Sequence, residues 1–116
     1  MTPARPRLER VRASAGIVKL AVQQIEDELG GPIDAEFLAD TLRELFDEAD
    51  TKGGVLGSLN QLLTMASRAA ALTPLDGEEP ESAACAIDEA AAFLLDSAGM
   101  HLHLATSTLH PQGERS

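Results

Sequence analysis

Residues 8–29 read LERVRASAGIVKLAVQQIEDEL, and their apolar side chains recur in alternating steps of three and four. The row consists of Leu8, Val11, Ala15, Val18, Val22, Ile25 and Leu29. Such spacing is the heptad seam of an amphipathic helix, because residues on one side of an α-helix recur every three or four positions. Gly30, Gly31 and Pro32 follow and end the helix. The stretch therefore predicts a long first helix with one apolar face.

Two more amphipathic helices follow. The second begins at Asp34 as N-cap and ends near Asp50, since Gly53 and Gly54 then interrupt the pattern. Its predicted buried stripe is Ala35, Leu38, Leu42, Leu45 and Ala49, widened by Phe46. The third helix covers about residues 55–72 and ends at Thr73-Pro74. Its predicted buried row is Val55, Leu59, Leu62, Ala66 and Ala69, and its polar, nearly uncharged outer face is Asn60, Gln61, Thr64, Ser67 and Arg68.

A fourth helix is predicted from Ser82 to Leu109. Its apolar row is Ile87, Ala91, Leu95, Ala98, Leu102, Ala105 and Leu109. Gly99 interrupts the pattern, and the alternation from Met100 to Leu104 also fits a strand, so the continuation over residues 99–109 is left open. We favour a helix because Asp88, Asp96, His103 and His110 then fall on one polar face.

Four such stripes predict an all-α fold, a four-helix bundle that is mainly antiparallel with short loops. The chain has 116 residues, of which 44% are hydrophobic and 3% aromatic, so the predicted core is aliphatic and rich in alanine. We expect residues 1–7 to form a flexible basic arm, residues 8–110 a single helical bundle domain, and residues 111–116 a disordered tail.

Charge divides the chain into a basic tip and an acidic body. The net charge is −10, yet the first twelve residues carry Arg5, Arg7, Arg10 and Arg12 against Glu9, a balance of +3. The acidic total disfavours nucleic acid and anionic membranes as partners, and the arginines are predicted to contact an anion or an acidic protein. Cys85 is the single cysteine, and no signal-peptide pattern or membrane-length apolar run follows the N-terminus, which predicts a cytoplasmic protein.

Apolar residues remain outside the four stripes. Ile17 and Leu20 lie on the far side of the first helix, and Phe93, Met100 and Leu104 belong to a second row on the fourth. Central packing of these two helices explains the surplus as well as an interface does. If they form an interface, the predicted contact residues are Ile17, Leu20, Phe93, Met100 and Leu104.

No catalytic or metal-binding constellation is complete, so we predict no cofactor. Asp40, Glu44 and Asp47 share a predicted helix face, and Glu44-Leu45-Phe46-Asp47 resembles half of the acidic motif of all-α nucleotide pyrophosphohydrolases. The matching half is missing, because Leu29 stands where Glu26 would need an acidic partner.

These observations predict a non-enzymatic helical module that binds by helix faces, as a homodimeric regulatory or assembly adaptor. Its partner would be a second copy or another protein. Two alternatives remain: a nucleic-acid-associated regulator that uses the arginine arm, and a metal-dependent all-α nucleotide hydrolase.

Overall fold

The computed structural model describes residues 4–73 and 80–109, and it confirms the all-α fold. Over these residues there are four helices and no strand, when α4, the π-helical segment η2 and α5 are counted as one continuous helix. The elements are α1 (Ala4–Leu29), α2 (Ala35–Leu45), the 3-10 turn η1 (Glu48–Asp50), α3 (Val55–Ala71), α4 (Pro80–Phe93), η2 (Leu94–Gly99) and α5 (Met100–Leu109). The segment after Gly99 is thus helical, as favoured, and not a strand.

The chain divides into two units, Met1–Ile33 and Asp34–Ser116. The described part of the first unit is α1 and the short segment that follows it. This helix begins at Ala4, four residues before the predicted start, so Arg5 and Arg7 lie within it. The predicted single domain over residues 8–110 remains a prediction, and the predicted tail, residues 111–116, lies outside the described residues.

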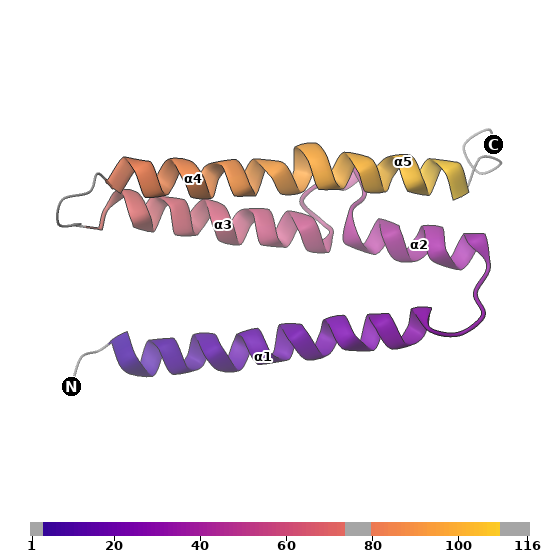
Figure 1. Ribbon diagram of the computed structural model, residues 1–116, viewed down its shortest axis with the longest axis horizontal. Helices are drawn as coiled ribbons and strands as arrows, with labels where there is room; N and C mark the ends of the chain where they lie inside the picture. The colour runs from indigo at the N-terminus through magenta and orange to yellow at the C-terminus, as the bar shows by residue number, and fades with distance from the viewer. Residues whose placement is uncertain (1–3, 74–79, 110–116) are drawn as a thin grey trace. The chain divides into compact units, whose positions relative to one another are not determined.

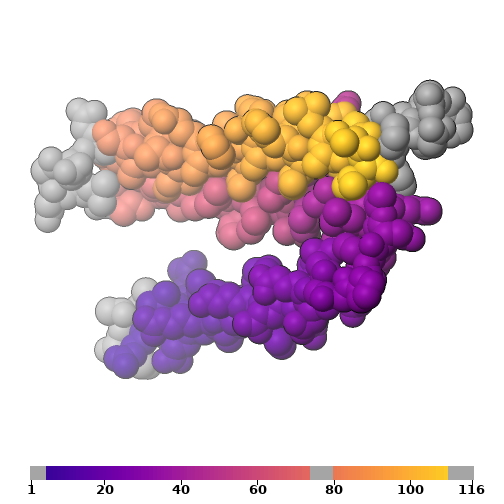
Figure 2. All heavy atoms as spheres, turned by 45° about the vertical axis from the view of Figure 1, so that its right-hand side comes forward, coloured from indigo at the N-terminus to yellow at the C-terminus, as the bar shows by residue number. Residues whose placement is uncertain are grey.

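In the second unit, two shorter helices lie one after the other along the long helix α4–η2–α5. Figure 1 shows α3 antiparallel to α4, and α2 antiparallel to α5. The side chains of α3 rest directly on those of α4 in the space-filling view (Figure 2). The second unit is therefore a two-layered antiparallel packing of helices.

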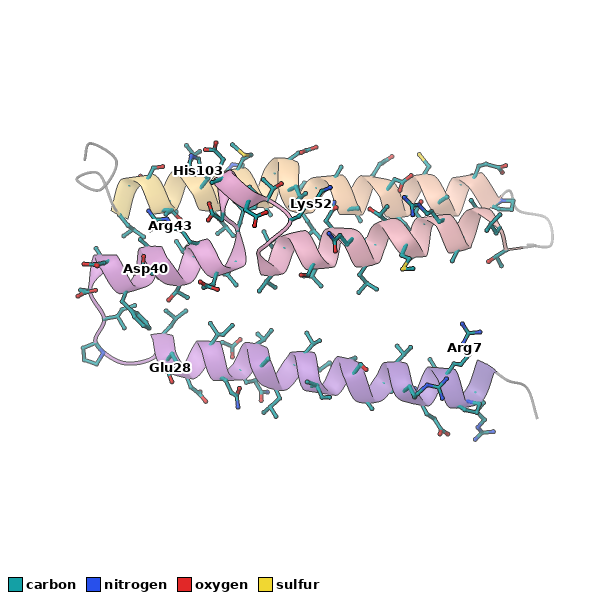
Figure 3. All side chains as sticks on the ribbon, turned by 180° about the vertical axis from the view of Figure 1, so that it is seen from behind. Arg7, Glu28, Asp40, Arg43, Lys52 and His103 are labelled. Carbon is teal, nitrogen blue, oxygen red and sulfur yellow. The ribbon has the colours of Figure 1, made fainter. Side chains whose placement is uncertain are left out.

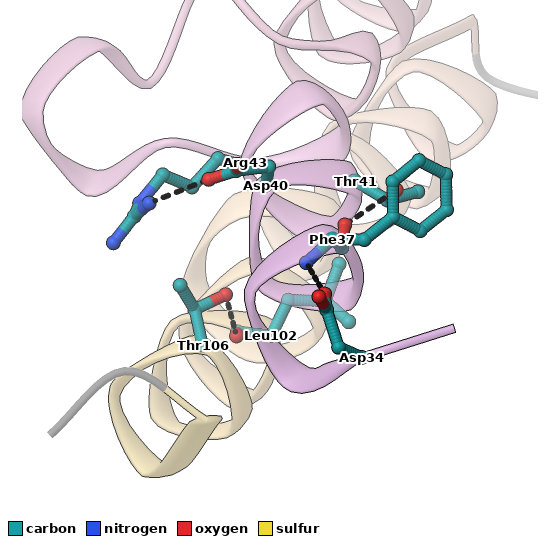
Figure 4. A network of polar contacts seen from close by, with 7 residues as sticks. All are labelled: Asp34, Phe37, Asp40, Thr41, Arg43, Leu102 and Thr106. Carbon is teal, nitrogen blue, oxygen red and sulfur yellow. Dashed lines mark hydrogen bonds and ion pairs between the residues drawn. The ribbon is translucent and has the colours of Figure 1, made fainter.

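Helix α2 is shorter than predicted. Its start is confirmed, because Asp34 Oδ1 accepts a 2.8 Å hydrogen bond from the backbone N–H of Phe37 (Figure 4). It ends at Leu45, and Phe46 turns to an extended conformation while its N–H still donates to Leu42 O at 2.9 Å. Asp47 then caps η1 by accepting from the N–H of Ala49. The predicted end near Asp50 is wrong because this second cap starts a separate turn.

Phe46 is the largest fully buried side chain among the described residues, at 1% exposure. Its ring lies against Gly99 in η2: a Cβ atom at Gly99 would lie 2.6 Å from both Cδ1 and Cε1 of Phe46. The ring thus requires a glycine opposite it, and it connects the end of α2 to the middle of the long helix. Ala49, predicted to be in the same stripe, is exposed.

The π-helical segment keeps the buried side of the long helix continuous. Its buried residues are Ala84, Ala91, Gly99 and Thr106, which are separated by seven, eight and seven positions. A face of an α-helix continues at steps of seven, so the step of eight contains one residue too many. A π-helical turn accommodates one extra residue, and η2 lies within that step. The predicted apolar row of this helix is buried or half-buried throughout.

We predict that Phe46→Ala lowers the free energy of unfolding by about 3 to 5 kcal/mol, since it leaves a cavity at a fully buried site. The matched control is Phe93→Ala, which removes the same ring from a side chain that is 63% exposed. Urea unfolding followed by circular dichroism measures both. Equal losses in the two variants would contradict the burial of Phe46.

Gly99→Ala should also destabilise the protein, by about 1 to 3 kcal/mol, because the new methyl group overlaps the Phe46 ring. The control is Gly16→Ala in α1, where no atom lies within 4 Å of the added Cβ. There the higher helix propensity of alanine predicts a gain of about 1 kcal/mol. Thermal unfolding should therefore shift in opposite directions, and a shift in the same direction would refute the close contact.

Candidate interaction surface

The inner side of α3 combines small and polar residues with leucines. Its small and polar members are Gly57, Asn60, Thr64 and Ser67, and its leucines are Leu56, Leu59 and Leu63, all buried or half-buried. Asn60 Nδ2 donates to the carbonyl oxygen of Ala91 at 2.8 Å, and Ser67 Oγ donates to that of Ala84 at 3.1 Å. The prediction that this face points outward is therefore wrong for Asn60, Thr64 and Ser67. Their side chains are short enough for close approach to α4, and both inter-helix donors find a backbone acceptor.

The opposite side of α3 exposes large apolar side chains. Val55 is 42% exposed, Leu62 60%, Met65 70% and Leu72 84%. They follow one another by seven, three and seven positions, which places them on one face of the helix. The predicted burial is therefore wrong for Val55, Leu62 and Ala69, whereas Leu59 and Ala66 of the same row are half-buried. We call Val55, Leu62, Met65 and Leu72 the outer row of α3.

Sequence reasoning missed the outer row, although the signal was present. The outer row recurs at helical spacing in the sequence. The small and polar residues of the inner side, Gly57, Asn60, Thr64 and Ser67, do so as well. The sequence prediction placed the apolar face toward the interior because of its hydrophobicity. In the structure, the close approach of two alanine-containing helices and two side-chain hydrogen bonds determine which face is inside.

The three predicted contact residues of the long helix are exposed. Phe93 is 63% exposed, Met100 41% and Leu104 61%. Met100 and Leu104 are four residues apart in α5 and so share a face. Phe93 does not continue their row, because η2 lies between them and its extra residue turns the helix by about 100°. The apolar residues of the long helix are thus two patches and not the single straight row that was predicted.

In the first unit, α1 exposes apolar side chains around its circumference. Ile17 is 69% exposed and Leu20 55%, on the side away from the heptad seam. The seam is exposed as well at Leu8, Val11, Val18 and Val22, with values from 46% to 61%. Arg5, Arg7, Arg10 and Arg12 are also exposed. Within the described part of this unit, neither face of α1 is covered.

The acidic residues proposed for a metal site do not form one. Asp40 is paired with Arg43, its Oδ1 lying 3.1 Å from Nη1 (Figures 3 and 4). Glu44 is exposed. Asp47 lies beyond the end of α2, so it is not on the helix face of Asp40 and Glu44. Within residues 4–73 and 80–109, no three His, Cys, Asp or Glu side chains are grouped to hold a metal ion.

A shallow pocket lies between the end of α2 and α5. Its volume is about 190 Å³, and Arg43, Glu48 and His103 are among its lining residues. His103 Nε2 lies 2.8 Å from Glu48 Oε2 across the pocket. Pockets for small organic ligands are typically about 300–1,000 Å³, so this hollow is below the usual size.

Comparison with known protein families, with curated proteins and with solved structures finds no match for this chain. Among the helices described, none combines the length and the apolar character that crossing a membrane requires. The class of the protein is therefore defined by its fold alone: an all-α packing of helices with large exposed apolar side chains.

We predict that Asn60→Ala reduces the free energy of unfolding by about 1 kcal/mol, because it removes a hydrogen bond between α3 and α4. Gln61→Ala is the control: Gln61 is the next residue in the same helix and is exposed, so its change should stay within about 0.5 kcal/mol. Chemical unfolding distinguishes the two. A larger loss for Gln61→Ala would mean that the assigned inner face of α3 is wrong.

Proposed function

We propose that the protein is a non-enzymatic helical interaction module, which binds a second copy or another protein through exposed apolar helix faces. One observation carries the proposal: α3 exposes four large apolar side chains, the outer row, in addition to the side that is buried or half-buried. A helix of a protein that acts alone shows one apolar stripe, which it buries. A second apolar face suits a helix whose outer side is covered by a partner.

The outer row has the composition of an interface. Burial of a side chain such as Leu62 stabilises a complex by about 1.5 to 3 kcal/mol, before the costs of association. Charged residues are depleted at interface centres, and Arg68 is the single charged residue in α3. Met65 adds a flexible side chain that adapts to a partner surface. These features support association through this helix.

Self-association is the simplest form of the proposal. Soluble oligomers are most often symmetric dimers, in which one surface meets its own copy. The exposed residues of α5 and the far side of α1, which the sequence predicted as contacts, offer additional apolar area. Such a dimer would act as a regulatory or assembly adaptor, in which the helix faces, and not a reaction centre, carry the activity.

The test is the solution mass of the full chain by light scattering. We expect the wild-type protein to exceed the mass of one chain, and Leu62→Glu to give a folded monomer, because a carboxylate at the centre of the contact would be desolvated. Ala71→Glu adds the same charge at an exposed position of α3 outside the outer row and should leave the mass unchanged. A monomeric wild type whose helicity and mass do not respond to Leu62→Glu would contradict self-association.

A further inference from the structure

Charge is separated along α1. Arg5, Arg7, Arg10 and Arg12 lie in its first third, whereas Glu26, Asp27 and Glu28 lie in its last turns. Arg7 and Glu28 mark the two ends of the helix in Figure 3. The exposed heptad seam runs between them.

This polarity is unfavourable for the helix by itself. A helix N-terminus favours acidic side chains and a C-terminus basic ones, because of the helix dipole. The first turn of α1 contains no acidic residue and its last turn no basic residue. The charges therefore do not stabilise the isolated helix. An oppositely charged neighbour at each end would compensate them.

We infer that α1 pairs with α1 of a second copy as an antiparallel coiled coil along the seam. The inference rests on the self-association proposed above, and it adds a helix, an orientation and a register. In an antiparallel pair the basic end of each helix lies beside the acidic end of the other. A parallel pair would place arginines beside arginines and carboxylates beside carboxylates, which disfavours that orientation.

The heptad fixes the register. Leu8, Ala15 and Val22 occupy a positions, and Val11, Val18 and Ile25 occupy d positions. Antiparallel packing sets a against d, so Leu8 meets the partner's Ile25, Val11 meets the partner's Val22, and Ala15 meets the partner's Val18.

The flanking positions then carry complementary charges. Arg7 at a g position faces the partner's Glu28, and Arg5 at an e position faces the partner's Glu26. The twofold axis makes each pair twice. Lys19 faces the partner's Arg12 near the centre, a like-charge contact that the twofold axis also makes twice. Ile17 and Leu20 remain on the outside of the pair.

Cross-linking of the full chain tests the orientation. The variant carries Leu8→Cys and Ile25→Cys, with Cys85→Ala to remove the native thiol. After oxidation, peptide mass spectrometry should find position 8 of one chain joined to position 25 of the other. Links from 8 to 8 and from 25 to 25 would show a parallel pair and overturn the inference. A monomer without links between chains would overturn it as well, including the case in which the seam is covered by its own chain.

Charge reversal tests the register. Arg7→Glu should weaken the dimer about tenfold, because it replaces two attractive pairs with two repulsive ones. Glu28→Arg in the same chain should restore the affinity. Arg10→Glu is the control, since Arg10 occupies an outward c position and makes the same change of charge. Arg7→Glu also places an acid near the helix N-terminus, which favours the helix, so circular dichroism should show no loss of helicity.

Sedimentation equilibrium of these variants and of Leu62→Glu separates the two claims. If Arg7→Glu has no more effect than Arg10→Glu while Leu62→Glu dissociates the dimer, the α1 pairing is wrong and the proposed function stands. If Arg7→Glu dissociates the dimer and Leu62→Glu does not, the pairing stands and the outer row of α3 is not the interface.

Discussion

The packing of the Phe46 ring against Gly99 is the constraint on which the second unit depends. Phe46 is the largest fully buried side chain among the described residues, and the other buried apolar residues there are Ala39, Ala84 and Ala91. Its ring occupies the point where α2 has ended and the long helix passes through its π-helical segment. The extra residue in that segment brings Gly99 onto the buried side together with Ala91 and Thr106.

Few other side chains in the described part of this unit are fully buried. Two side-chain hydrogen bonds join α3 to α4, and the leucines on the inner side of α3 are half-buried and not fully enclosed. Such hydrogen bonds contribute about 1 kcal/mol each, less than the burial of a leucine or a phenylalanine. Several large apolar side chains remain exposed, among them Leu62, Met65 and Leu72, so a partner that covers them would add apolar burial.

Helical periodicity predicted the all-α fold, the Asp34 cap and the buried row of the long helix, because these depend on local spacing and capping. It failed at Phe46, where a side chain that fits a helix pattern leaves the helix to fill a site opposite Gly99. It also placed Asn60 and Ser67 on the outside of α3, since their acceptors lie on a neighbouring helix that no local pattern reveals. The predicted contacts Ile17, Leu20, Phe93, Met100 and Leu104 are exposed, but the outer row of α3 was not anticipated.

A protein whose large apolar residues are covered by a second copy should depend on that copy for stability. Thermal unfolding of the wild-type chain over a hundredfold range of concentration tests this dependence most directly, because binding that accompanies folding makes the melting temperature depend on concentration. The account predicts a melting temperature that rises by a few °C for each tenfold increase in concentration. A melting temperature that stays constant over the whole range would contradict it, and would show that the chain is stable with its apolar faces uncovered.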